Sequence, residues 1–284
     1  MAKSIFIVLY MTVAIIVTIN SIRGLVGGDM MLGHLALFLT SAPVAFMLVR
    51  LMLLKDKART DPNLKVAALL GALGASIAII GWYREMLPYP VLVTALGMAV
   101  LFGLYVGWYS KLDRSASKLM VGKKLPGFEL ETADGAAVAS GTFEGSPAVL
   151  IFYRGNWCPL CVAQVKEMAA NYNQLKAMGA RVVFVSPQPQ TNTAGLAKKF
   201  GTDGLEFMRD GGNAAAKILG INARFGTPMG MQVLGYSSHT VLPTVIITDT
   251  SGTVIWTHET DNYRVRPEPE TYLAVLKEAG IKAA

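Results

Sequence analysis

"PAVLIFYRGNWCPLCVAQVKEM", residues 147–168, contains the change of pattern that decides the fold. Its first part is a short apolar run rich in β-branched and aromatic residues, which predicts a buried strand ending near Arg154. From Pro159 onward the apolar positions recur with helical spacing until Gly179 stops the pattern. Pro159 suits the first helical position, where a missing N–H costs nothing. The stretch therefore predicts a strand followed at once by a helix.

The sequence after this stretch continues to alternate between the two patterns. Further strands are predicted at RVVFVS (181–186), LEFM (205–208), TVLPTVIITD (240–249) and TVIWTHE (253–259), and further helices at TAGLAKKFG (193–201), GNAAAKILG (212–220) and EPETYLAVLKEAG (268–280). The turn sequence DTSG separates the last two strands and predicts a hairpin. The order β-α-β-α-β-α-β-β-α predicts an α/β sandwich with a mixed central sheet.

The N-terminal part of the chain has a different composition. Four apolar runs are present, at Ser4–Ile19, Met30–Leu54, Leu64–Trp82 and Tyr89–Tyr109. A helix of about 20 apolar residues spans a bilayer. We therefore predict an all-α, four-span transmembrane domain over 1–110, a basic linker over 111–120 and the α/β domain over 121–284. The first run could instead be a signal peptide, but no small-residue cleavage site follows it.

Basic residues predict the orientation of these spans. Lys55, Lys57, Arg59 and Lys65 crowd the second loop and several lysines follow the fourth span, whereas Arg23 and Arg84 stand alone in the other two loops. Because cytoplasmic loops carry an excess of Lys and Arg, we expect the N-terminus, the 55–65 loop and everything after 110 to be cytoplasmic in a multi-pass inner or plasma membrane protein. An odd number of spans would reverse the last part.

Small residues predict where the spans touch. Ala67, Gly71 and Ala75 recur every four residues, and Gly103 and Gly107 form a GxxxG pattern, a spacing that lets helix backbones approach closely in lipid. The net charge of +7 is a modest excess in each half of the chain, and much of it clusters beside apolar runs. This distribution does not indicate nucleic-acid binding.

Cys158 and Cys161 are the only cysteines of the chain. If the helix starts at Pro159, Cys158 lies at its N-cap, where the free N–H groups and the helix dipole stabilise a thiolate. Cys161 is one turn further on and can attack a species formed at Cys158. We therefore assign Cys158 as the nucleophile and Cys161 as the resolving cysteine.

Two other interpretations of the CxxC pair are open. Half of a zinc site would need two more ligands, and the three histidines, His34, His239 and His258, do not supply a close pair. Two inert buried cysteines would not explain the flanking Trp157 or the strand–helix junction, which is typical of thioredoxin-like redox motifs. We expect neither a metal nor a cofactor.

Pro243 begins an apolar strand, where a residue without an N–H cannot lie in the middle of a ladder. Thioredoxin-like folds carry a cis-proline at this position, beside the CxxC pair, and it leaves the preceding backbone free to pair with substrate. We therefore expect a cis peptide bond between Leu242 and Pro243, with the ordinary trans bond as the alternative.

Residues from about 121 to 278 resemble the alkyl hydroperoxide reductase/thiol-specific antioxidant family, especially its peroxiredoxin-like members. FYRGNWCPLC (152–161) resembles the FYRGxWCPxC signature, and VGKKLPGFELETADGAAV (121–138), VSPQPQ (185–190) and YRVRPEPE (263–270) are similar to further segments of that family. The resemblance implies a thioredoxin fold and thiol-based antioxidant or disulfide chemistry. No family resemblance is seen in the apolar part.

The chain departs from the peroxidase pattern PxxxTxxC of this family. Gly155 stands at the Thr position and Ile151 at the Pro position, and the strand that should bring in an arginine begins Leu242-Pro243. Without these groups a peroxide loses positioning and charge stabilisation. Arg154 and Arg264 are the candidates to substitute. Both could instead be solvated surface charges, and for Arg264 we favour that interpretation.

We therefore predict a membrane-tethered thiol oxidoreductase that reduces disulfides or oxidised thiols through a CPLC dithiol/disulfide cycle. A thiol peroxidase acting on hydrogen peroxide or lipid hydroperoxides is the alternative, and a membrane redox sensor is the third. Each needs a thiol reductant such as a thioredoxin or glutathione system. NARFGTPMGMQVLGYSS (222–238) is a candidate substrate-side loop, although a plain surface insertion is slightly favoured.

Overall fold

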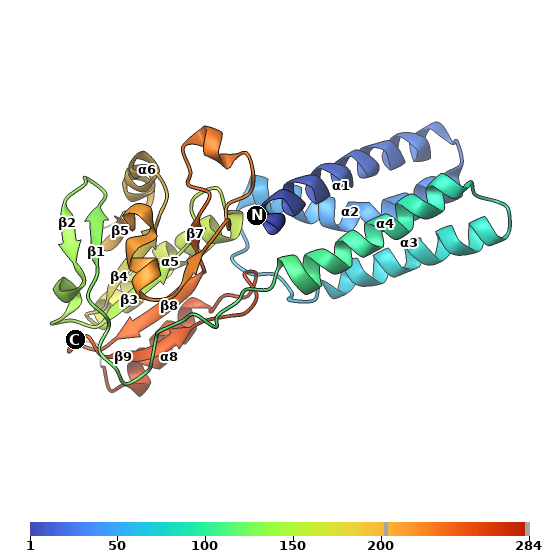
Figure 1. Ribbon diagram of the computed structural model, residues 1–284. Coiled ribbons are helices and arrows are strands. Elements are labelled where there is room, and N and C mark those ends of the chain that lie inside the picture. Colours follow the sequence, from blue (N-terminus) through green and yellow to red (C-terminus); the bar gives the residue numbers. More distant parts are fainter. Residues whose placement is uncertain (202–203, 282–284) are drawn as a thin grey trace. The chain divides into compact units, whose positions relative to one another are not determined.

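The computed structural model describes residues 1–201 and 204–281 (Figure 1). The chain divides into two compact units. The helical unit comprises Ala2–Leu54 and Thr60–Lys111, and the α/β unit comprises Met1, Lys55–Arg59 and Leu112–Ala284. The short segment Lys55–Arg59, which connects two helices of the helical unit, thus belongs to the α/β unit.

The helical unit contains four long helices. Their bounds are α1 Ala2–Gly27, α2 Met31–Leu54, α3 Lys65–Tyr83 and α4 Tyr89–Leu104, and a π-helical turn η1 follows at Tyr105–Tyr109. All four predicted apolar runs are therefore helical. Each is long and apolar enough to cross a membrane, by length and composition.

The closest helix contact of α3 lies on a different face from the one expected. A Cβ placed on the buried Gly74 would lie 2.6 Å from the carbonyl oxygen of Ala36 in α2. Around Gly71, Gly103 and Gly107, no atom of another described segment lies within 4 Å of such a Cβ. The prediction that these three glycines mark helix contacts is wrong within this unit, because the spacing of small residues does not fix the rotation of a helix about its axis.

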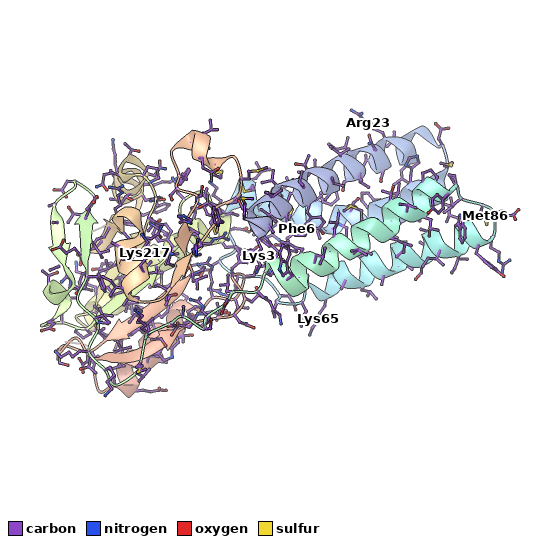
Figure 2. All side chains as sticks on the ribbon, in the orientation of Figure 1. Lys3, Phe6, Arg23, Lys65, Met86 and Lys217 are labelled. Atoms are coloured by element: carbon purple, nitrogen blue, oxygen red, sulfur yellow. The ribbon has the colours of Figure 1, made fainter. Side chains whose placement is uncertain are left out.

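The ends of the helical unit differ in their basic residues. Lys3 and Lys65 lie at one end, and Arg23 and Met86 lie at the other (Figure 2). Helix α2 continues through Pro43. The starts of α1 and α3 therefore lie at the same end of the helical unit.

The α/β unit contains the strands and helices predicted from residue 147 onward, except that the single strand predicted over 240–249 is two strands, Thr240–Val241 and Thr244–Thr248, which belong to different sheets. Its strands are β1 Glu129–Thr132, β2 Ala137–Ala139, β3 Ala148–Phe152, β4 Arg181–Ser186, β5 Leu205–Arg209, β6 Asn222–Ala223, β7 Thr240–Val241, β8 Thr244–Thr248 and β9 Val254–His258. Its helices are α5 Pro159–Ala177, α6 Gln190–Phe200, α7 Ala214–Ile218 and α8 Pro269–Glu278, with short 3-10 turns η2 Ser140–Phe143, η3 Gly211–Asn213 and η4 Met231–Leu234. The pairs β1–β2 and β6–β7 were not predicted from the sequence.

The main sheet is mixed, as predicted. Its strand order is β2-β1-β5-β4-β3-β8-β9. Strands β3, β4 and β5 pair in parallel, β8 pairs antiparallel to β3, and β8 and β9 form the predicted hairpin. The parallel strands are joined by helices, as parallel connections require.

Strand β3 is buried along its whole length, because both faces of the sheet are covered. On one face Leu150 and Phe152 pack in a core with Ala215 and Ala216 of α7. Helix α5 packs against β4 and α8. The carboxyl ends of β3 and β4 emerge at the same edge, where open α/β sheets place their sites.

Candidate active site

The CxxC pair lies at the amino end of α5, directly after β3. Helix α5 begins at Pro159, as predicted, and Cys158 is its N-cap residue with extended backbone. The carbonyl oxygen of Cys158 accepts hydrogen bonds from the N–H groups of Cys161 and Val162. Both cysteines are free thiols, and their exposed fractions are 3% for Cys158 and 0% for Cys161. Only Cys158 retains any contact with solvent.

The guanidinium group of Arg266 is the nearest positive charge to the two sulfur atoms. Its Nη2 lies 3.3 Å from Sγ of Cys161 and 4.0 Å from Sγ of Cys158. Its Nη1 donates to Oε1 of Gln164 at 2.6 Å, and Gln164 in turn donates to the hydroxyl of Tyr272 at 3.2 Å. Arg266 is only 5% exposed. Side chains of α5 and α8 thus hold one buried arginine, from the segment before α8, on the dithiol.

Arg266 and Gln164 were not predicted from the sequence as site residues. Arg266 lies within the segment YRVRPEPE, but nothing in the sequence distinguishes it from its neighbour Arg264. Gln164 is a buried polar residue that lies one helical turn from Leu160 and from Met168, which are both apolar and buried. That position was the one available signal, because a buried amide needs a partner.

The two thiols have opposite pKa shifts. Burial raises the pKa of Cys158, and the hydrogen bond and charge of Cys161 raise it further, although Arg266 and Arg154 oppose this. Burial also acts to raise the pKa of Cys161, but the hydrogen bond from Cys158, the charge of Arg266 and the contributions of Arg154 outweigh it and lower the pKa to about 5. The reduced pair therefore carries one negative charge at neutral pH, nearer to Cys161 than was expected from the position of Cys158 at the helix N-cap.

Two further titratable groups face the site. Burial, followed by the charge of Cys161, raises the pKa of Tyr153. Burial, followed by the charges of Arg114 and Arg266, lowers the pKa of His258. Both groups are therefore neutral at pH 7, and Arg266 and Arg154 are the charges that act on the thiols.

Arg154 is half-buried and stacks against the aromatic side chains beside the cysteines. Its guanidinium carbon lies 4.6 Å from the centre of the Trp157 ring and 5.4 Å from that of Tyr263. Its Nη2 donates to the carbonyl oxygen of Gly226. The structure thus places two predicted site residues, Arg154 and Trp157, in one stack over the active-site loop.

Arg264 does not have the solvated surface position that the sequence favoured. It is 1% exposed. The turn that precedes it is fixed by side-chain hydrogen bonds, since the N–H of Arg264 donates to Oδ1 of Asn262 and the N–H of Asn262 donates to the hydroxyl of Thr260. This turn directs the segment inward, and the surface interpretation of Arg264 is wrong.

The loop between β3 and α5 is fixed by a buried glutamine. Gln188 accepts a hydrogen bond from the N–H of Asn156 at 2.8 Å and donates to the hydroxyl of Tyr153 at 2.9 Å. Gly155 has a φ of +142°, and a Cβ there would lie 2.7 Å from Nε1 of Trp157. A threonine at this position would therefore collide with Trp157, so the peroxidase hydroxyl has no room in this loop.

The segment 222–238 lies against this loop rather than apart from it. The hydroxyl of Tyr236 donates to Oδ1 of Asn156 and accepts a hydrogen bond from Asn192 at 2.8 Å. Gly226 contributes the carbonyl oxygen that Arg154 binds. The position of the segment is that of a wall of the site.

Pro243 lies beside the site, but the expected cis-proline is wrong. The peptide bond between Leu242 and Pro243 is trans. The N–H of Leu242 donates to the carbonyl oxygen of Ile221 at 2.8 Å, and Arg114 binds the carbonyl oxygen of Pro243 and the hydroxyl of Thr244. The backbone before and after the proline is thus engaged within the chain, which is compatible with the ordinary trans geometry.

The zinc alternative has no further support from the geometry. Within residues 1–201 and 204–281, no three side chains of His, Cys, Asp or Glu are grouped as metal ligands are. The polar side-chain group next to both sulfurs is the guanidinium of Arg266, which is a cation with no acceptor for a metal. The arrangement supports thiol chemistry.

A βαβ unit with a dithiol at its strand–helix junction, followed by a ββα unit, defines a thioredoxin-fold redox domain. The AhpC/TSA family matches residues 121–257, and this part of the chain is a domain of that family. The expectation drawn from the FYRGNWCPLC stretch is confirmed.

The proteins that are similar to this domain are named for two kinds of thiol chemistry, peroxide reduction and thiol–disulfide exchange. The chloroplastic peroxiredoxin Q of Populus jackii is 32% identical over 117 residues, which are 41% of this chain and 54% of that protein. The thiol-disulfide oxidoreductase ResA of Bacillus cereus is 29% identical over 93 residues, which are 33% of this chain and 51% of that protein. The chain thus spans about half the length of the curated relatives it matches.

Solved structures of peroxiredoxins are also similar to this chain. Reduced Prx3 from Vibrio vulnificus superimposes with a TM-score of 0.48 and 21% identity, over 56% of this chain and 99% of that one. Peroxidoxin BcpB from Mycobacterium tuberculosis gives 0.47 and 20%, over 56% and 97%.

Proposed function

We propose that this protein is a membrane-anchored thiol peroxidase that reduces a small hydroperoxide with Cys158 and Cys161. The observation that carries the proposal is the contact of one buried guanidinium, that of Arg266, with both sulfur atoms. Relatives named peroxiredoxin Q match the same domain. A peroxidase needs a stabilised thiolate and a positive charge near the departing oxygen. The guanidinium of Arg266, in contact with both sulfurs, can serve both purposes.

The burial of the sulfurs favours a small oxidant over a folded protein disulfide. A protein disulfide must bring its own sulfur into line with the attacking thiolate. Cys158 is 3% exposed, and the stack of Arg154 on Trp157 and the hydrogen bond of Tyr236 to Asn156 lie at the same loop. A hydroperoxide needs only the width of two oxygen atoms to reach the sulfur.

The reaction proceeds through the two cysteines in order. The thiolate of Cys161 takes the proton of Cys158, whose sulfur then attacks the terminal peroxide oxygen. The O–O bond breaks, Cys158 becomes a sulfenic acid, and the leaving oxygen takes a proton from Cys161 and departs as an alcohol or, from hydrogen peroxide, as water. Cys161 then attacks the Cys158 sulfur, the sulfenic oxygen leaves as water with a proton from solvent, and a disulfide forms.

A thiol reductant completes the cycle. It transfers two electrons and two protons to the Cys158–Cys161 disulfide and is itself oxidised to a disulfide. We propose a thioredoxin- or glutathione-type donor, and the burial of the two sulfurs favours the small glutathione-type thiol, because a folded reductant has the same limited access as a folded oxidant. Arg266 stabilises the negative charge on either sulfur, because its Nη2 lies within 4.0 Å of both.

We further propose that the four helices of the helical unit cross a membrane and that the α/β unit is cytoplasmic. The helices have the length and composition of spans. The segment Lys55–Arg59 and the chain after Lys111 belong to the same compact unit, so they must lie on the same side of the bilayer. Lysines at that end of the helices favour the cytoplasmic side.

A thiol–disulfide oxidoreductase is the second candidate. Gly155 leaves no hydroxyl at the position where the peroxidase pattern has threonine, and a threonine does not fit there. Similarity to a thiol-disulfide oxidoreductase is also found. This candidate keeps the same dithiol cycle and differs only in the oxidant.

Stopped-flow fluorescence of the reduced full chain in detergent micelles distinguishes the two candidates. Trp157, next to Cys158, reports oxidation after mixing with hydrogen peroxide or with a lipid hydroperoxide. The peroxidase proposal predicts a fast second-order change that Cys158→Ser abolishes. A rate equal to that of a free thiolate, together with fast oxidation by a small disulfide, would assign the second candidate instead. The full chain is needed because Arg59 and Arg114 hold residues of the site and lie outside the predicted α/β domain of residues 121–284.

A further inference from the structure

Arg59 lies far from the cysteines in sequence but belongs to the same unit. It ends the segment Lys55–Arg59 between α2 and α3, which is part of the α/β unit. The preceding Ala58 is fully buried. In the sequence, Arg59 is one of the basic residues that predict the orientation of the membrane spans. Its contacts show that it is more than a flanking charge.

The guanidinium of Arg59 bridges the two segments that form the thiolate site. Its Nη2 donates to Oε2 of Glu167, on helix α5 with the cysteines, at 2.6 Å. Its Nε donates to the carbonyl oxygen of Arg266 at 3.2 Å, and its Nη2 also reaches the carbonyl oxygen of Pro267 at 3.3 Å. Its Nη1 lies 3.4 Å from Oε1 of Glu268.

We propose that Arg59 is a positioning residue for Arg266. It ties the backbone that carries Arg266 to the helix that carries Cys161, and so keeps the guanidinium of Arg266 on the thiolate. The proposal rests on the role of Arg266 at the thiolate, and it holds for either oxidant. It gives the loop between α2 and α3 a part in the redox site.

The effect of Arg59 passes through Arg266 rather than through its own charge. The cations that lower the pKa of Cys161 are Arg266 and Arg154. Arg59 is directed instead at two backbone carbonyl groups and two carboxylates. Only a planar group with several donors in fixed directions can make these contacts together, so a lysine cannot replace it fully.

A second arginine of the α/β unit provides a matched control. Arg181 forms a two-bonded pair with Glu206, and the exposed fractions of the two side chains are 30% and 29%. The corresponding values for Arg59 and Glu167 are also 30% and 29%. Arg181 begins β4, whereas the active site lies at the end of this strand. Replacing it removes a comparable ion pair from the other edge of the sheet.

The test is an ultraviolet titration of the thiolate in the reduced full chain in detergent, with the cysteine-free variant as the blank. We expect Arg266→Gln to raise the pKa of the thiolate by about 1–3 units, because it removes the charge beside it. We expect Arg59→Gln to raise it by about half a unit, which is roughly a threefold loss of thiolate below the pKa. Arg59→Lys should give a smaller rise, and Arg181→Gln none.

The possible outcomes separate this inference from the proposed function. A shift with Arg266→Gln but none with Arg59→Gln would overturn the positioning role and leave the site intact. No shift with either would overturn the role of Arg266 itself. Equal shifts with Arg59→Gln and Arg181→Gln would show a general loss of stability. If Arg59→Gln does not fold, Arg59→Lys and Glu167→Gln decide the matter, since each keeps part of the bridge and each should still raise the pKa.

Discussion

Arginines at the two edges of the central sheet have different surroundings. At the edge where β4 begins, Arg181 is partly exposed and paired with the carboxylate of Glu206. At the edge where β4 ends, Arg266 is buried and contacts an amide and two sulfurs. A guanidinium paired with a carboxylate is already neutralised, whereas one held by a neutral amide keeps its charge for a thiolate. The difference separates an ion pair that supports the fold from a charge that supports chemistry.

Among changes at the edge where β4 ends, removing a cysteine sulfur should have the largest effect on oxidation by peroxide. Cys158→Ser should abolish oxidation by peroxide, because no other described sulfur nucleophile has any exposure at this loop. Cys161→Ser should oxidise Cys158 more slowly, because the thiolate that takes its proton is lost, and the reaction should stop at the sulfenic acid. Stopped-flow fluorescence measures the first step, and a sulfenic-acid reagent traps its product. Full turnover by the Cys161→Ser variant would contradict the two-cysteine cycle.

Removing the buried charge should have the next largest effect. We expect Arg266→Gln to lower the rate constant for peroxide reduction roughly 100-fold, the usual cost of losing one donor at a developing oxyanion. Arg266→Lys should recover part of the rate, since it keeps the charge but not the fork. Steady-state kinetics of the two variants at pH 7 checks this. Wild-type activity in Arg266→Gln would show that the guanidinium is not used.

The pH dependence of oxidation should follow the thiolate. Because the pKa of Cys161 is lowered to about 5, the pair stays ionised above this pH and loses its charge as the pH falls through it. The rate constant should thus be level from pH 6 to 8 and fall about tenfold per unit below pH 5, as for a single ionisation. A midpoint near 8.5, the ordinary value for a free cysteine, would contradict the stabilisation.

A side chain at Gly155, in the active-site loop, should destabilise the α/β unit. Gly155→Ala places a Cβ 2.7 Å from the Trp157 ring nitrogen, at a φ of +142°. We expect a loss of about 1–3 kcal/mol in the free energy of unfolding of the α/β unit from the backbone strain. Chemical denaturation followed by tryptophan fluorescence measures it. An unchanged stability would mean that the loop can relax without cost.

The smallest effect is expected at the opposite edge. Arg181→Gln should cost about 0.2–1 kcal/mol, because the pair with Glu206 is partly exposed. It should leave the oxidation rate unchanged. The same denaturation and stopped-flow experiments test both statements. A loss of activity as large as that of Arg266→Gln would remove the distinction between the two edges.

The sequence was sufficient to predict the elements but not all of the contacts between them. Local patterns predicted β3, the start of α5 at Pro159 and the β8–β9 hairpin, because strand and helix periodicity depend on neighbouring residues. The place of Arg266 at the thiols could not be predicted, because its contact with Cys161 spans 105 positions and depends on the turn at Asn262. No local pattern encodes such a contact.

Two other discrepancies have the same physical origin. Arg59 carried a charge that the positive-inside rule explained, so its contact with Arg266, 207 positions away, gave no separate signal. The glycine spacing around Gly71 identified a helix with small residues but not which of its faces is packed. In both cases the residue type could be interpreted from the sequence, but the residue that it contacts in the tertiary structure could not be predicted.

The central claim is that Arg266 holds a single thiolate shared by Cys158 and Cys161. The most direct measurement is the ultraviolet thiolate titration of the reduced full chain beside Arg266→Gln. We predict one thiolate per chain at pH 7, a midpoint near the pKa of about 5 that Cys161 has in the structure, and a clear upward shift in the variant. Two neutral thiols at pH 7 in the unsubstituted chain, or the same midpoint in both proteins, would contradict it.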